Sequence, residues 1–416
     1  MFKKLHLACL FGFTSLAAAA ADVAAIGTTN YPSLADAFSA VAEGQTITLL
    51  VDADIDAMIP VTKSVTLDLN GKTITNNVAG NRLFRLSGVT FTIDGNGGKV
   101  TIPTTNAKSY GFVDFRDAAN AAAPATSLIV RDATFEGATD EGSLFAFRAD
   151  GQSIEFYNVN ANCTPSNTYS IINGYEQKVS IKVSGGEYVF DSTLKTVGAF
   201  QAGPGSDIVF DNVNVNASAG PIFECVANTA TFSDCDFTCT ATNSYFASCL
   251  AASYGAVVNV NGGEYSANFP LYVYNSGGSI NVDGGTFNGA VAAIKADNDA
   301  SATSQTKITV DDGTFIGNVS VDNRSELIVK GGSYTTDVSN YCADGFTTKE
   351  TIGEDGKPVF TIVGVETIVV ETICDTTGNN DENRVYNIQG IFVGHETDNL
   401  PAGIYIKNSK TIYVTK

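Results

Sequence analysis

The residues best suited to chemistry are acidic and basic side chains between positions 110 and 150. They are Asp114, Arg116, Asp117, Arg131, Asp132 and Arg148. Carboxylates can accept or donate a proton and a guanidinium can stabilise negative charge, so a convergent set would suit general acid–base catalysis. The same side chains would also pair with one another as a structural salt-bridge cluster. The sequence favours the structural cluster, and the set is kept as the catalytic candidate.

Two further sets could bind a ligand. Asp311 and Asp312 are adjacent carboxylates, which suit Ca²⁺, although related segments carry Asn-Gly or Asp-Gly here and favour a turn. No other cofactor is indicated. Tyr254, Tyr272 and Tyr274 are the best candidates for surface aromatics that bind a glycan, because Tyr272 and Tyr274 alternate and would share one face of a strand.

These candidates are set in a repeated β pattern. Alternating apolar residues, a turn of Gly, Asn or Asp, and an aromatic residue recur, as in Ile181–Tyr188, Val258–Tyr265 and Ile280–Phe287. The period of two predicts strands, and one such unit cannot bury its apolar face alone, so neighbouring units must stack. We therefore expect an all-β fold, a right-handed parallel β-helix with one coil per repeat, over residues 63–345.

An aromatic column lies three residues after the turns of this pattern. Its members are Phe135, Tyr188, Phe237, Tyr265, Phe287, Phe315 and Tyr334. Pointing outward, the column would offer sugars a stacking platform; pointing inward, it would form a core stack. The mixture of Phe with Tyr favours the inward orientation.

The chain resembles the pectate-lyase-like right-handed β-helix proteins, and its opening resembles the entry segment of Bacteroidetes members of that group. Segments 31–50 and 65–74 carry this resemblance. The fold hosts many functions, so the resemblance implies an architecture more than an activity. The Asn-Thr-Asp, Gly-His-Gly and Arg-Ile-Lys phrases of polygalacturonases do not occur, and the two histidines are His6 and His395.

Residues 22–62 are expected to cap the first coil. Ser33 suits a helix N-cap, with Asp36 three residues later as a variant of the capping box. The apolar face of this helix would consist of Leu34, Ala37, Phe38 and Val41, with Gly44 as the stop. Such a helix would protect the unpaired edge of the first coil.

The first residues resemble an export signal, with Lys3 and Lys4 before an apolar stretch and cleavage expected after Ala21. No segment has the length of a transmembrane helix. Loss of residues 1–21, which hold no acidic residue, would change the net charge from −20 to −22. This charge repels nucleic acid, and it would repel a polyanionic glycan unless a local basic cleft existed.

Seven cysteines lie beyond the export signal. They are Cys163, Cys225, Cys235, Cys239, Cys249, Cys342 and Cys374. Buried thiols are the favoured interpretation, ahead of a disulfide between coils or a metal site. Cys225 and Cys249 follow their turns at similar distances and are expected to stack on adjacent coils.

The tail is expected to be a separate module. Closing strands and a linker over 346–372 precede a small antiparallel β module over 373–416. Its Tyr386-x-x-x-Gly390 strand and Pro401-x-Gly403-Ile-Tyr hairpin resemble the C-terminal sorting domain of type IX secretion cargo, although Phe392 departs from that pattern. The resemblance implies that export machinery is a partner of the tail.

Together these features predict a secreted or outer-membrane-surface protein without catalytic activity. We expect an adhesin-like or glycan-binding β-helix whose partner is a polysaccharide or a host or bacterial surface glycan. The alternative is a divergent polysaccharide lyase or hydrolase, which would require the Arg and Asp candidates to converge in an open groove.

Overall fold

A computed structural model describes residues 22–104, 109–116, 125–139, 142–194, 196–242, 247–365, 384–389, 391–395, 400–401, 403–407 and 410–414. The predicted signal peptide, Asp117 and Cys374 lie outside these residues. The chain divides into two compact units, which meet in sequence between Val363 and Gly364. The first unit is a β-solenoid of about nine turns, consistent with a parallel β-helix. The predicted fold class is confirmed.

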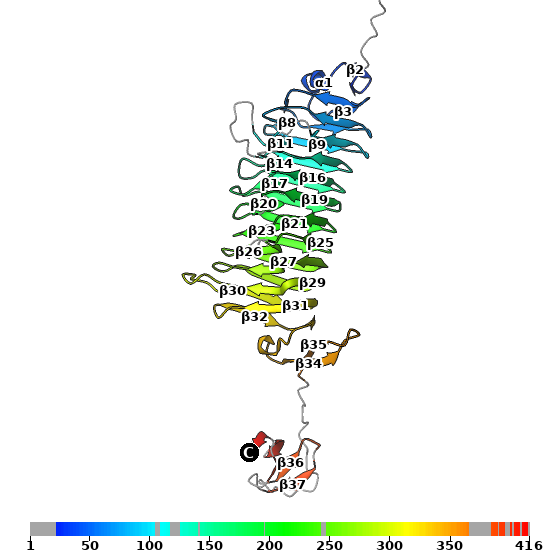
Figure 1. Cartoon of the computed structure of the whole chain (residues 1–416). Coiled ribbons are helices and arrows are strands. Elements are labelled where there is room, and N and C mark those ends of the chain that lie inside the picture. The colour runs from blue at the N-terminus through cyan, green and yellow to red at the C-terminus, as the bar shows by residue number, and fades with distance from the viewer. Residues whose placement is uncertain are drawn as a thin grey trace, which may run out of the picture. The chain divides into compact units, whose positions relative to one another are not determined.

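Three columns of parallel strands form the first unit, as Figure 1 shows. The first column is β3 Thr46–Leu49, β6 Val65–Asp68, β9 Thr90–Asp94, β12 Ser127–Arg131, β15 Ser153–Tyr157, β18 Ser180–Ser184, β21 Asp207–Asp211, β24 Thr229–Ser233, β27 Val257–Ala267, β29 Ser279–Ala296, β30 Thr306–Val310 and β32 Ser325–Val329.

The long strands β27 and β29 turn the corner into the second column. That column also contains β4 Ala53–Ile55, β7 Thr73–Asn76, β10 Lys99–Thr101, β13 Thr134–Gly137, β16 Asn160–Ser166, β19 Glu187–Ser192, β22 Asn214–Ala217, β25 Asp236–Cys239, β31 Thr314–Val321 and β33 Ser333–Tyr334. The third column is β5 Ile59–Val61, β8 Arg82–Leu86, β11 Gly111–Asp114, β14 Ser143–Ala146, β17 Ser170–Gly174, β20 Phe200–Ala202, β23 Phe223–Val226, β26 Ser248–Ser253 and β28 Phe269–Val273, continued by β29 and β31.

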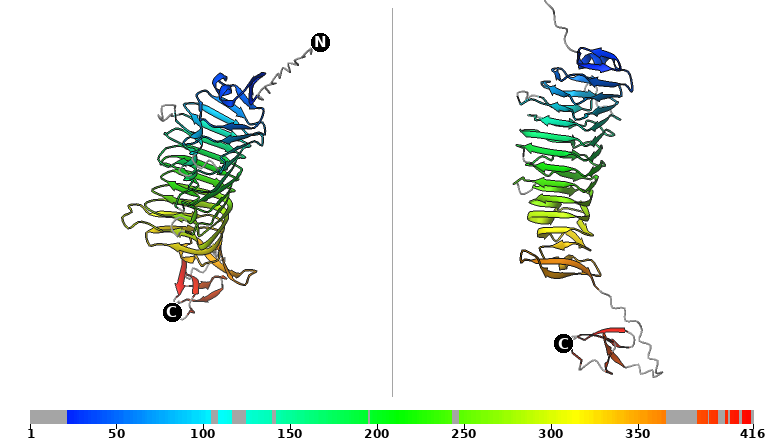
Figure 2. Two further views of the ribbon diagram at one scale, coloured as in Figure 1. Left: turned by 45° about the horizontal axis from the view of Figure 1, so that its top comes forward. Right: turned by 90° about the vertical axis from the view of Figure 1, so that its right-hand side faces the viewer.

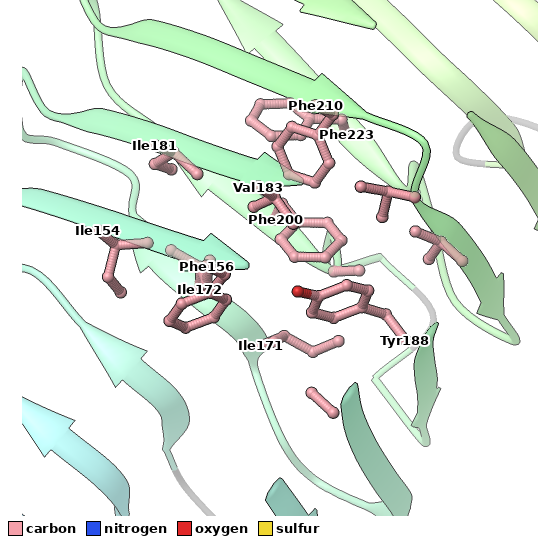
Figure 3. Packing of buried hydrophobic residues seen from close by; sticks show 14 of the residues in the cluster. Ile154, Phe156, Ile171, Ile172, Ile181, Val183, Tyr188, Phe200, Phe210 and Phe223 are labelled. Carbon is pink, nitrogen blue, oxygen red and sulfur yellow. The ribbon is translucent and has the colours of Figure 1, made fainter. Parts of the chain in front are cut away.

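The aromatic column points inward, as predicted. Its seven side chains are at most 1% exposed. Parallel pairing places like residues in register, so that Tyr265 pairs with Phe287 and Phe287 with Phe315. The rings of Tyr265, Phe287, Phe315 and Tyr334 stack with successive centroids 5.1, 4.9 and 4.7 Å apart. Figure 3 shows the same interior around Tyr188 and Phe200. The repeat is therefore a core stack rather than a sugar-binding platform.

The turn residues of the repeat adopt a left-handed backbone. Asp132, Asn158 and Asp234 have φ angles of 48°, 51° and 49°, which Asn and Asp tolerate better than most residues. Glycine is required where coils approach closely, since a Cβ on Gly186 would lie 2.0 Å from the carbonyl oxygen of Val159. The spacing of these Asp, Asn and Gly residues along the sequence therefore sets where each coil turns from one strand into the next.

The first coil is covered by α1 Leu34–Ala40 and by the antiparallel strands β1 Ala24–Ile26 and β2 Thr29–Tyr31, where β1 also pairs with β3. The backbone N–H of Asp36 donates to Ser33 Oγ at 3.0 Å, which confirms the predicted N-cap. The Ser33 hydroxyl donates in turn to the Asp36 carboxylate at 2.6 Å. The buried helix residues include Leu34, Ala37 and Phe38, as expected.

The last coil is closed by a 3₁₀ turn η1 Ser339–Tyr341, by β34 Phe346–Ile352 and by β35 Pro358–Gly364, which pairs antiparallel with β33. Figure 2 shows this closing element below the stacked coils. The second unit is a small antiparallel sheet of β36 Val385–Asn387, β37 Phe392–Gly394, β38 Gly403–Lys407 and β39 Lys410–Val414. No helix among the described residues is long and apolar enough to cross a membrane.

The described cysteines are thiols, and most are buried. Those are Cys163, Cys225, Cys235, Cys239 and Cys249, with Cys342 half-buried. Burial raises the pKa of the Cys235 thiol to about 12, so it stays protonated. The expected stacking of Cys225 on Cys249 is wrong: Cys225 pairs with Ala252, because the connection before β26 is longer than the one before β23.

Candidate functional site

The outer face of the third strand column carries the candidate site. Arg85 on β8 pairs with Asp114 on β11, which pairs with Ala146 on β14, which pairs with Asn173 on β17. Neighbours of these outward residues point inward, where Phe84, Val113 and Phe145 are buried. Parallel registration therefore holds charged side chains from successive coils beside one another on the outer surface.

Asp114 is the centre of this site. Arg148 Nε lies 2.8 Å from Asp114 Oδ1, and Arg116 Nε lies 3.6 Å from the same oxygen. Arg82 Nη1 lies 3.7 Å from Asp114 Oδ2. The Asp114 side chain is only 5% exposed, whereas those of Arg116 and Arg148 are each 31% exposed. One buried carboxylate thus orients three guanidinium groups, of which two reach solvent.

The sequence did not single out the two arginines of the preceding coil. Arg82 is buried and donates from Nε and Nη2 to the carbonyl oxygen of Ser143, both at 3.3 Å. Burial lowers the pKa of the Arg82 guanidinium to about 10; Asp114 opposes this shift, and Arg148, Arg116 and Arg85 add to it. Knowledge that Arg85 pairs with Asp114 would have pointed to Arg82 and Arg85. The repeat is longer than usual between residues 95 and 132, so the sequence alone did not show which residues of β8 and β11 pair.

Arg85 is the fourth arginine of this site, and its Nε–H group is available as a hydrogen-bond donor. Its Nη2 donates to Asn81 Oδ1 at 3.3 Å, while its buried Nε has no hydrogen-bond partner among the described residues. We call Arg82, Arg85, Arg116 and Arg148 the arginine cluster. Among the described residues, Asp114 is the carboxylate that pairs with these arginines, so the four guanidinium groups outnumber their paired carboxylate. Such a site can hold an anion with paired N–H donors.

The other catalytic candidates lie elsewhere. Arg131 ends β12 in the first column, where its Nη1 lies 3.3 Å from Asp94 Oδ1 and its guanidinium lies 5.7 Å from the centre of the Tyr157 ring. Asp132 forms the following turn and accepts a hydrogen bond from Asn158 Nδ2 at 3.2 Å. Neither contributes to the arginine cluster, because β12 belongs to the first strand column and β11 to the third.

Tyr272 and Tyr274 share one outer face, with ring centroids 5.1 Å apart. The expectation that they are surface aromatics is wrong, since they are only 3% and 7% exposed. Lys295 Nζ lies 4.6 Å from the centre of the Tyr272 ring, and Phe269 packs against the same ring. Tyr254, by contrast, is 57% exposed. Their role in glycan binding stays a prediction.

Asp311 and Asp312 are engaged as turn residues. Asp311 Oδ1 lies 2.9 Å from Lys330 Nζ, and Asp312 Oδ1 accepts a hydrogen bond from the backbone N–H of Gly313 at 2.8 Å. Among the described residues, no group of three or more His, Cys, Asp or Glu is placed to hold a metal ion. These contacts agree with the turn interpretation, and a calcium ligand pair stays a prediction.

Comparison with known proteins gave no match to a protein family, to a curated protein or to a solved structure. The feature that bears on function is therefore the geometry and charge of the arginine cluster.

Proposed function

We propose that this chain is an exported β-helix protein that binds an acidic glycan and does not cleave it. The arginine cluster carries the proposal. The chain has a net charge of −20, which repels polyanions, and the cluster supplies the local positive site that such a ligand needs. A carboxylate or sulfate of the glycan would accept hydrogen bonds from the outer amino groups of Arg116 and Arg148.

The protonation of Arg82 favours binding over chemistry. An arginine that abstracts a proton must itself be deprotonated, and a pKa of about 10 leaves Arg82 protonated at neutral pH. Its side chain is also only 7% exposed and is held by Ser143 and Asp114. A divergent polysaccharide lyase or hydrolase is the second candidate, because Arg and Asp side chains do converge on one outer face.

The cellular setting belongs to the same proposal. The export-like sequence of residues 1–21 supports secretion, and the antiparallel strands β38 and β39 support the likeness of the tail to a type IX sorting domain. The pectate-lyase-like, Bacteroidetes-type assignment rests on the entry segment and the β-helix. In this setting the protein would bind a polysaccharide or surface glycan outside the cell.

Binding of oligogalacturonate to the secreted full chain, measured by isothermal titration calorimetry, tests the proposal. Arg148→Ala should weaken binding about 10- to 100-fold, since a hydrogen bond to a charged group contributes about 1.5–3 kcal/mol. Arg131→Ala is the matched control: it removes the same charge from another face and should change the affinity less than twofold. A sulfated oligosaccharide and a neutral one of equal length show whether the negative charge is what is recognised.

An activity assay on the same glycans, run with and without Ca²⁺, separates the two candidates. We expect neither unsaturated uronate nor new reducing ends. Product release that is lost in Arg148→Ala would replace the binding function with the catalytic one. Equal binding of acidic and neutral glycans, or equal losses in Arg148→Ala and Arg131→Ala, would overturn the proposal.

A further inference from the structure

We infer that Tyr175 stacks on a sugar ring of the glycan whose acidic group the arginine cluster holds. This inference rests on the proposed function and adds a residue that determines ligand shape. Tyr175 follows β17, the strand next to β14 in the third column. Neither its sequence context nor the repeat pattern had marked it, because it lies outside the inward aromatic column.

Exposure separates Tyr175 from most tyrosines of this chain. Its side chain is 58% exposed, whereas Tyr188, Tyr265 and Tyr334 are at most 1% exposed. A large aromatic ring that is left in water gains nothing from the hydrophobic core, so packing does not explain its presence. Three other described tyrosines are exposed: Tyr110, Tyr169 and Tyr254.

Register places Tyr175 beside the arginine cluster. Asp114 pairs with Ala146 and Ala146 with Asn173, so the positions two residues later are Arg116, Arg148 and Tyr175 in successive coils. Backbone hydrogen bonds between these two coils run from the N–H of Phe147 to the carbonyl oxygen of Asn173 at 2.9 Å and, beyond both strands, from the N–H of Gly151 to the carbonyl oxygen of Lys178 at 2.8 Å. Adjacent strands lie about 4.8 Å apart, so the backbone of Tyr175, at the start of the turn after β17, lies one coil beyond that of Arg148.

The local backbone holds this position. Asn173 Oδ1 accepts a hydrogen bond from the backbone N–H of Tyr175 at 3.2 Å, and Asn173 Nδ2 donates to Ser143 Oγ at 3.2 Å. The carbonyl oxygen of Ser143 also receives the two hydrogen bonds from Arg82. One polar network therefore fixes both the base of the arginine cluster and the start of the Tyr175 turn.

Arginine beside an exposed aromatic ring matches the chemistry of an acidic sugar. The carboxylate takes the guanidinium donors, while the apolar C–H face of the neighbouring ring covers the aromatic face. Tyr110 and Tyr169 immediately precede β11 and β17, six residues before Arg116 and Tyr175. Six residues of extended chain span about 20 Å, so these two tyrosines lie at the opposite end of the strands from the exposed Arg116 and Arg148. One short ligand cannot reach both edges, which leaves Tyr175 as the partner of the arginines.

The absence of tryptophan from the chain provides a direct probe. Tyr175→Trp should bind trigalacturonate at least as tightly as the wild type, and its fluorescence should change on binding. Tyr254→Trp is the matched control, because Tyr254 is 57% exposed but follows β26, three coils away. Its fluorescence should stay constant at the same ligand concentrations.

Calorimetry with trigalacturonate completes the test. Tyr175→Ala should weaken binding about tenfold, Tyr175→Phe less than twofold and Tyr254→Ala less than twofold, with unchanged melting temperatures. Full affinity in Tyr175→Ala, together with a loss in Arg148→Ala, would overturn the stacking inference and leave the proposed function intact. A loss in neither variant would overturn both. Equal responses of Tyr175 and Tyr254 variants would overturn the inference as well.

Discussion

At the scale of single residues, the burial of an aromatic side chain shows whether it belongs to the core or is available to a ligand. Both Tyr and Phe occupy positions of the inward column, so the column requires an aromatic ring and not a hydroxyl group. The hydroxyls of Tyr188 and Tyr265 are buried without a hydrogen-bond partner among the described residues. Tyr334 differs, because its hydroxyl donates to the carbonyl oxygen of Gly331 at 3.0 Å.

Removal of these hydroxyl groups should affect the free energy of unfolding differently at Tyr265 and at Tyr334. Tyr265→Phe removes an unsatisfied buried group and should leave the free energy of unfolding unchanged or raise it by about 1 kcal/mol. Tyr334→Phe breaks a hydrogen bond and should lower it by about 1 kcal/mol. Urea denaturation measures both. A clear destabilisation by Tyr265→Phe would show that its hydroxyl has a partner in solution, such as a buried water molecule.

Replacement of Tyr188 and Tyr265 by Phe should alter the response of stability to alkali. Burial raises the pKa of Tyr188 and Tyr265 well above the value of about 10 expected in the unfolded chain. Below pH 10 both states keep the proton; above it the unfolded state loses the proton first, so stability falls as pH rises. Double replacement by Phe should make this fall less steep in denaturation curves recorded between pH 9 and 11.

At the scale of elements, the helix that covers the first coil depends on its cap. Ser33→Ala removes the acceptor of the Asp36 N–H and should lower the free energy of unfolding by about 1 kcal/mol. Ser39→Ala on the exposed face of the same helix is the control and should stay within about 0.5 kcal/mol of the wild type. Equal effects of the two substitutions would mean that the cap does not stabilise the first coil.

The elements were largely predictable from sequence, whereas the site was only partly so. Alternation, turn residues and the Ser33 cap are local signals, so the strands, corners and α1 followed from them. The cluster depends on which coil lies next to which. Asp114, Arg116 and Arg148 were foreseen, but Arg82 and Arg85 come from register across the irregular step around residues 95–132, and Tyr175 comes from the pairing of β14 with β17. Sequence distance grouped Arg131 with Asp114, although their strands belong to different columns.

At the scale of the whole molecule, a truncation between the two units tests whether each one is stable without the other. Ending the chain after Val365 retains β35, which closes the last coil, and removes the small antiparallel sheet. The β-helix unit should unfold within about 2 °C of its melting temperature in the full chain, since the units have separate cores. Differential scanning calorimetry measures this. A drop of 10 °C or more would show that the tail stabilises the coils.

The stacking of coils also has a mechanical consequence. Hydrogen bonds between successive strands run along the axis of the β-helix unit, so a pull along that axis loads one coil interface at a time. The end coils, which are covered by α1 at one end and by β35 at the other, would then unfold and detach before the middle coils. Each detached coil of roughly 25 residues releases up to about 90 Å of extended chain. A glycan held on coils near α1 would therefore be tethered through a filament that lengthens in steps and limits the force on the bond.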